Sequence, residues 1–163
     1  MTTPSTSTTT APTSGEAGSV RAEQDALQLA LAAEHAAVWG YGTVGAALAE
    51  GTRAEVVLAQ QAHRDLRDRV AELLRAAGVD PVASSAAYAL PFPVLSAVDA
   101  AALAVTLEDG TTVAWVYVLD QAAARDTREL AVTSASAAEV RAVSWRAQAG
   151  RTPVTSATPG LGG

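Results

Sequence analysis

Four ionisable side chains are the best placed to do chemistry: three interrupt apolar residues repeated at helical spacing, and the fourth lies on an Ala-rich helical segment. They are Glu34, His63, Glu108 and Glu139. A carboxylate inside an apolar core must be paired, protonated or bound to a metal, because burying it unpaired is costly. Carboxylates and imidazoles also bind iron and manganese. We therefore predict either a paired polar network or a metal site.

Three segments of the chain repeat apolar positions at alternating spacings of four and three residues, which is one face of an α-helix. The three seams are Leu27, Leu31, Glu34, Val38, Tyr41, Gly45 and Leu48; Val56, Ala59, His63, Leu66, Val70, Leu73 and Ala77; and Val98, Ala101, Val105, Glu108, Thr112, Trp115 and Leu119. We predict helices over about 22–50, 52–78, 96–122 and 126–149. The fourth helix has no single clear face, because its Ala-rich surface supports several.

Local signals support the ends of these helices. Thr52 and Glu55 have the spacing of a capping box, and Gly78 suits the left-handed position after a helix. Gly110 weakens the third helix by about 1 kcal/mol, but the apolar spacing continues on both sides of it. Gly40, Gly42 and Gly45 are expected to allow close approach by a bulky neighbour.

The lengths of the connections predict an all-α, antiparallel four-helix bundle. Short turns join the first helix to the second and the third to the fourth, so each pair forms a hairpin. The connection 79–96 could span roughly 55–60 Å when extended, whereas a 26-residue helix is about 39 Å long. It can therefore return along the whole bundle, as the single long crossover of a ferritin-like fold does.

The two ends of the chain differ in composition from the middle. Residues 1–19 are mostly Thr, Ser, Pro and Gly, and residues 150–163 are similar. Such segments bury too little apolar surface to become ordered. We predict a disordered tail at 1–19, a bundle domain at 20–149 and a second disordered tail at 150–163.

Composition excludes several functions. The net charge of −6 argues against nucleic-acid binding, and the lack of cysteine excludes disulfides and thiolate sites. No apolar run reaches the roughly 18 residues that span a membrane, and the first fifteen residues lack an apolar signal region. We expect a cytoplasmic protein that does not insert into membranes, and a homo-oligomer is possible on the Ala- and Gly-rich helix faces.

The predicted metal ligands form an incomplete set. Di-metal bundles use one Glu from each of two helices and Glu-x-x-His from each of the other two. Here Gln60 stands three residues before His63, where a Glu belongs, and Ala142 stands three residues after Glu139, where a His belongs. Folding at the short turn between the third and fourth helices sets Glu108 opposite Glu139. Folding at the connection between the first and second helices sets Glu34 opposite Arg67 or Asp68, and His63 then lies one helical turn or more away.

The alternative to a metal site is a structural network. In that interpretation a seam glutamate forms a buried ion pair with an arginine such as Arg67, Arg128 or Arg146. His63 is then a core histidine that is hydrogen-bonded to Glu34.

Four stretches of the sequence resemble a bacterial ferritin-like family of unknown function that is common in high-GC genomes. They are LAAEHAAVWGYG at 31–42, YALPFPV at 88–94, LAVTLEDG at 103–110 and VSWR at 143–146. The resemblance covers roughly residues 22–149 and implies a ferritin-like bundle with no assigned activity.

Two functional hypotheses follow. The first is a non-enzymatic bundle for self-association or partner binding. The second is an iron- or manganese-binding oxidoreductase or storage protein with a reduced site of Glu34, His63, Glu108 and Glu139. Whether the protein is an enzyme depends on which hypothesis holds.

Overall fold

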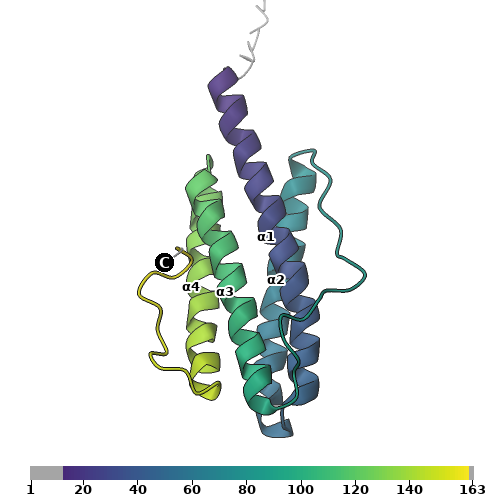
Figure 1. Ribbon diagram of the computed structural model, residues 1–163. Coiled ribbons are helices and arrows are strands. Elements are labelled where there is room, and N and C mark those ends of the chain that lie inside the picture. The colour runs from purple at the N-terminus through teal and green to yellow at the C-terminus, as the bar shows by residue number, and fades with distance from the viewer. Residues whose placement is uncertain (1–12, 162–163) are drawn as a thin grey trace, which may run out of the picture.

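The computed structural model describes residues 13–161, and it is an antiparallel bundle of four long helices (Figure 1). The elements are α1 (Ser14–Ala47), the short 3-10 helix η1 (Glu50–Thr52), α2 (Arg53–Ala76), α3 (Ala97–Gln121) and α4 (Arg125–Gln148). Helix α1 packs against α2 and α3, and α3 packs against α4. The predicted all-α four-helix bundle is confirmed, and α3 runs without a break through Gly110.

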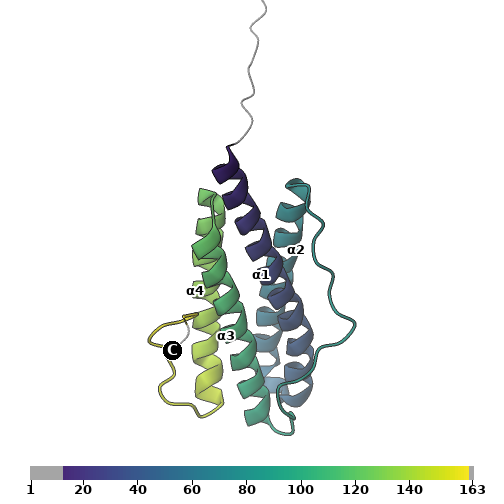
Figure 2. The ribbon, with the colours of Figure 1, turned by 45° about the horizontal axis from the view of Figure 1, so that its top comes forward.

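The connection between α2 and α3 is the predicted long crossover. It leaves α2 at one end of the bundle and returns along α1 to the other end (Figures 1 and 2). The side chain of Gln28 binds it twice, donating to the carbonyl of Asp80 and accepting from the amide of Val82, both at 2.7 Å. Lower down, the rings of Trp39 and Tyr88 lie 5.7 Å apart. These contacts hold the crossover against α1.

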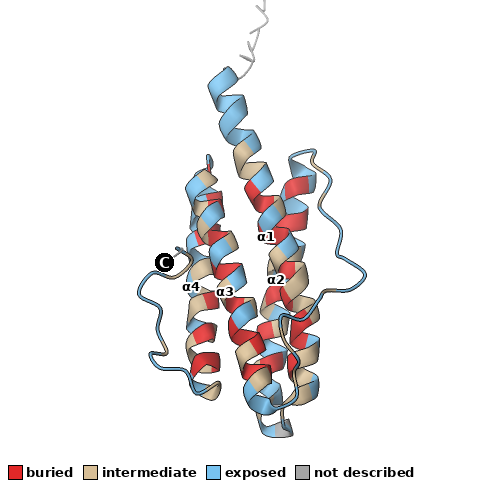
Figure 3. Ribbon diagram, in the orientation of Figure 1, coloured by how far each residue is buried: buried red, intermediate tan, exposed pale blue. Residues whose placement is uncertain are grey.

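Helix α1 begins at Ser14, earlier than the predicted start near residue 22. Thr13 caps it in a reciprocal capping box with Glu16, which satisfies free amides of the first turn. The turns before Ala22 are exposed and project beyond the bundle (Figure 3). Composition therefore misplaced the start of this helix, because a local cap stabilises it without burial. The rest of the predicted N-terminal tail, residues 1–12, lies outside the described residues.

Two other expected helix ends have different outcomes. Gly78 has a φ of 73° and lies in the expected left-handed position after α2. The predicted capping box at Thr52 is wrong, because its side chain makes no capping hydrogen bond to α2. Glu55 instead accepts hydrogen bonds from Ser144 and Gln148 of α4.

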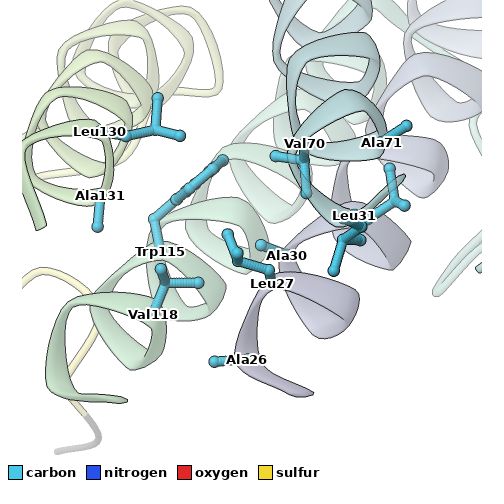
Figure 4. Close-up of a cluster of buried hydrophobic side chains, with 11 residues drawn as sticks. Ala26, Leu27, Ala30, Leu31, Val70, Ala71, Trp115, Val118, Leu130 and Ala131 are labelled. Carbon is cyan, nitrogen blue, oxygen red and sulfur yellow. The ribbon is translucent and has the colours of Figure 1, made fainter. Parts of the chain in front are cut away.

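The apolar core consists of two clusters that are stacked along the bundle axis. One cluster includes Leu27, Leu31, Val70, Trp115 and Leu130 (Figure 4). The other cluster includes Tyr41, Val44, Val56, Leu103 and Trp145. Between the two clusters, the buried seam residue is Glu34 in α1, His63 in α2 and Glu108 in α3. A polar layer therefore separates two apolar halves.

Helix α3 is the most apolar of the four. Among residues 13–161 it alone has the length and composition of a membrane-crossing helix, and 44% of its apolar window is buried inside the bundle. Because α3 packs against both α1 and α4, its apolar character is explained by its place in the core.

The segment after α4 lies against the bundle, although its composition predicted a disordered tail. Arg146 donates to the carbonyl of Val154 at 3.1 Å, and the amide of Ser156 donates to Glu139 at 3.3 Å. Gly160 has a φ of 73° and contacts Val116 of α3. Hydrogen bonds from the backbone of this segment, rather than apolar burial, attach it to α4.

The glycines of α1 and α3 provide a test of packing. A Cβ at Gly110 would meet no atom within 4 Å, so Gly110→Ala is expected to raise the free energy of unfolding by about 1 kcal/mol. A Cβ at Gly40 would lie 2.7 Å from Leu107, which is the bulky neighbour at this position. Gly40→Ala should therefore raise the free energy of unfolding by less than Gly110→Ala does, or should lower it. Urea denaturation of both variants measures the difference, and equal gains would contradict the close approach of α1 and α3.

Candidate functional site

Three of the four predicted site residues meet at the centre of the bundle. Glu34 comes from α1, His63 from α2 and Glu108 from α3, and each is 0% exposed. The imidazole lies between the two carboxylates. Its Nδ1 is 2.6 Å from an oxygen of Glu34, and its Nε2 is 3.2 Å from Oε1 of Glu108. Both ring nitrogens are therefore engaged by carboxylates.

The hydrogen bond between His63 and Glu34 was one of the sequence-based interpretations, and it is present. The expected offset, with His63 a turn or more along α2 from the level of Glu34, does not keep the two side chains apart. One helical turn rises only about 5.4 Å, and the extended glutamate and imidazole side chains cover that offset. Arg67, which was expected opposite Glu34, instead pairs with its neighbour Asp68 at 2.8 Å.

Three further side chains complete the network from the two apolar clusters and from α4. Trp115 donates its indole N–H to Oε1 of Glu34 at 2.7 Å, and the hydroxyl of Tyr41 donates to Oε1 of Glu108. The Nε of Arg141 donates to the same oxygen of Glu108 at 2.8 Å. All four helices therefore contribute at least one member, and the network ties them together.

Glu139, the fourth predicted residue, lies outside this network. Its carboxylate accepts from Nη1 of Arg146 at 2.7 Å and from the amide of Ser156. Arg146 also bonds to Asp109 of α3. The inward face of α4 is formed by Ala138, Ala142 and Trp145, which are fully buried. That face turns Glu139 toward the flank, so the expected placement of Glu139 opposite Glu108 in a shared site is wrong.

Arg141 is the site residue that the sequence analysis missed. Arg128 and Arg146 were considered as partners for a seam glutamate, but Arg128 binds the carbonyls of Ala122 and Ala123. A signal for Arg141 was available, since it stands three residues after Ala138 and four before Trp145, which is the spacing of one helical face. The Ala-rich surface of α4 concealed it, because several faces of that helix are equally compatible with burial.

The charges of the network stabilise one another. Burial by itself lowers the pKa of His63, but hydrogen bonds to Glu108 and Glu34 outweigh burial and raise its pKa to about 9. Burial raises the pKa of Glu108, and the hydrogen bonds from His63 and Arg141 outweigh it, so the net direction is downward. Burial also raises the pKa of Tyr41, with a further rise from the neighbouring Glu108 charge. At neutral pH the imidazole is therefore a cation and the phenol is neutral.

The hydrogen bonds of the network leave no free nitrogen on His63. A metal-bound histidine must offer one free ring nitrogen, whereas both nitrogens of His63 face carboxylates. Within residues 13–161, no group of three or more His, Cys, Asp or Glu side chains is arranged to hold a metal. Gln60, at the position of a missing ligand, donates to the carbonyl of Val38 at 2.8 Å. Oε2 of Glu108 is buried without a hydrogen-bond partner. Metal binding by the predicted set stays a prediction.

The raised pKa of His63 predicts a pH-dependent stability. The ordinary pKa of a histidine is 6.5, and the pKa of His63 in the folded chain is about 9. Between pH 6.5 and 9, His63 therefore keeps its proton in the folded chain and has lost it in the unfolded chain. The free energy of unfolding should then be highest below pH 6.5 and fall, by up to about 3 kcal/mol, as pH rises to about 9. Urea denaturation across this range measures the slope. His63→Gln should abolish it and His35→Gln should retain it; a slope that survives His63→Gln would contradict the assignment.

The different places of Glu108 and Glu139 predict different costs of losing a carboxylate. Glu108→Gln leaves the buried cations His63 and Arg141 poorly compensated and is expected to destabilise by about 3 kcal/mol or more. Glu139→Gln leaves Arg146 paired with Asp109 and keeps an amide oxygen that can accept from Arg146, so a smaller cost of about 1 kcal/mol is expected. Thermal and urea unfolding compare the two variants. Equal costs would place the two carboxylates in similar surroundings and overturn this description.

Comparisons with known proteins support the fold and assign no activity. None of the curated proteins matches this chain. The structure is similar to that of a conserved hypothetical protein, Rv2844, from Mycobacterium tuberculosis, with a TM-score of 0.76 and 40% sequence identity over 78% of this chain and 96% of the other. A family model described as a domain of unknown function matches residues 26–162. The expected kinship with a bacterial family of unknown function is thereby supported, and the chain belongs to the DUF4439 family.

Proposed function

We propose that this protein is a non-enzymatic helical bundle that acts by self-association or by binding a partner. One observation carries the proposal: the buried ionisable groups are engaged with one another across all four helices. His63 has no free nitrogen, and Glu34 accepts from both His63 and Trp115. A catalytic group needs access to substrate, and these residues are fully buried.

The charge balance of the network supports a structural role. Glu34 and Glu108 carry two negative charges, while His63 and Arg141 carry two positive charges at neutral pH, because the pKa of His63 is raised to about 9. The sum is zero without any added ion. In a di-metal bundle the corresponding layer holds a large excess of carboxylates that the metal ions neutralise. Arg141 here supplies the charge that a metal would bring.

The surfaces available for binding are apolar side chains on the outside of the bundle. Leu95 is 87% exposed just before α3, and Val140 is 72% exposed on α4. The Ala- and Gly-rich faces of α1 contribute less than the sequence suggested, since Gly40 and Gly45 contact Leu107 and Val56 inside the bundle. We place the contacts of a second copy or a partner on the exposed apolar positions of α2, α3 and α4.

The competing function is an iron- or manganese-binding oxidoreductase or storage protein of the ferritin-like superfamily. The convergence of Glu34, His63 and Glu108 favours it, as does the single long crossover, which ferritin-like folds share. The loss of Glu139 from the site and the engaged nitrogens of His63 argue against it.

Elemental analysis of protein purified without chelator separates the two functions. We expect no stoichiometric metal, and we expect Glu34→Ala to lower the melting temperature while leaving the metal content unchanged. Because a ligand that binds only the native state raises stability, saturating Mn(II) or anaerobic Fe(II) should not shift the melting temperature of the wild-type chain. Close to two irons per chain, or a metal-induced shift that Glu34→Ala abolishes, would refute the proposal.

A further inference from the structure

Helices α2 and α4 leave a groove between them on the side of the bundle opposite the contact between α1 and α3. Close packing joins α1 to α2, α1 to α3 and α3 to α4, and is much sparser between α2 and α4. The groove has a volume of about 480 Å³, within the range of small-molecule sites. Its lining is Glu55, Leu58, Ala59, Ala62, Arg141 and Trp145.

The walls of this groove are mainly apolar. Leu58 is 72% exposed although it lines a concave surface, so most of its side chain faces solvent rather than protein. Ala59 and Ala62 are the next two groove residues on α2, and their small side chains leave room between the helices. Trp145 lines the groove from α4. An apolar chain lying between α2 and α4 would remove Leu58 and the exposed part of Ala62 from water, whereas Trp145 and Ala59 are already buried.

The polar group of the groove is a guanidinium with unused donors. Arginine has five N–H donors, and within residues 13–161 the side chain of Arg141 makes one hydrogen bond, from Nε to Glu108. Its Nη2 is buried and has no partner. A ligand oxygen cannot contact this buried nitrogen, whereas Nη1, which makes no hydrogen bond within residues 13–161 and is not among the buried atoms, can donate to a ligand oxygen.

The other charged residue of the groove does not compete for this guanidinium. The two carboxylate oxygens of Glu55 accept from the hydroxyl of Ser144 at 2.5 Å and from the side-chain amide of Gln148 at 3.0 Å. Glu55 therefore lies at the α2 start of the groove with its own partners. Arg141 is the polar anchor that remains.

We propose that the groove between α2 and α4 binds a small apolar monocarboxylate. The carboxylate accepts a charge-assisted hydrogen bond from Nη1 of Arg141. The hydrocarbon part lies along Leu58, Ala59 and Ala62. This ligand site goes beyond the proposed self-association or partner binding and does not depend on it.

Calorimetric titration with octanoate tests the site, with octylamine and octanol as probes of equal chain length. A ligand of this size is expected to bind with a Kd on the order of 1 mM or below. Octanoate should bind more tightly than octanol, because only the carboxylate pairs with Arg141. Octylamine should bind more weakly than octanoate, because its ammonium group offers no acceptor to the free donors of Arg141.

Matched variants locate the binding. Leu58→Asp introduces a like charge and removes the apolar wall, and we expect it to weaken octanoate binding by tenfold or more. Val57→Asp makes the same change at the adjacent exposed position, which does not line the groove, and should leave the affinity unchanged. Because both positions are exposed, neither change should unfold the chain. Arg141→Lys, which keeps the positive charge but not the planar donors, should reduce the preference for octanoate over octanol.

The proposal is overturned by any of three results. One is no saturable octanoate binding at millimolar concentration. Another is equal weakening by Leu58→Asp and Val57→Asp, which would show a general charge effect. The last is octylamine binding as tightly as octanoate, which would show an apolar contact without recognition of the carboxylate. The metal analysis of the preceding section is unaffected by any of these results, so the two proposals fail separately.

Discussion

The position of one imidazole between two carboxylates controls the interior of this bundle. His63, Glu34 and Glu108 are completely buried, and each would be unfavourable there without the others. The three come from three different helices, so the network forms only when α1, α2 and α3 are docked at one register. Misplacing any helix by a turn would leave a buried charge without its partner, and this makes alternative packings costly.

The polar layer also connects the two apolar clusters that it separates. Trp115 belongs to one cluster and donates to Glu34, whereas Tyr41 belongs to the other and donates to Glu108. Apolar contacts between Ala-, Val- and Leu-rich helices are tolerant of sliding, because small side chains fit many neighbours equally well. Directional hydrogen bonds from two large aromatic residues remove that freedom. Stability therefore comes mainly from the apolar clusters, and the register comes from the layer between them.

Arg141 links the interior to the surface. Its Nε donates to Oε1 of Glu108, and its side chain also lines the groove between α2 and α4. In four-helix bundles that hold two metals, a cation also lies between carboxylates of facing helices. Here the cation is covalently part of α4, so it cannot be exchanged or change its oxidation state.

The predictable parts of this structure are those with a local or periodic cause. Helical spacing in three segments placed Glu34, His63 and Glu108 on inward faces, and the length of the connection 79–96 predicted the crossover. Gly78 marked the end of α2, because a left-handed residue there favours glycine. Composition was misleading at Ser14, where a capping box starts a helix without burial, and along residues 151–161, which backbone hydrogen bonds attach to α4.

The remaining features depend on how the helices are turned relative to one another. An Ala-rich helix such as α4 buries similar small side chains on several faces, so its sequence alone leaves its rotation undetermined. Docking against α3 selected the face of Ala138, Ala142 and Trp145, and that choice brought Arg141 to Glu108 and turned Glu139 toward Arg146. The identities of the charged residues were readable in the chain, but their pairing required the rotation of α4, which only packing in three dimensions sets.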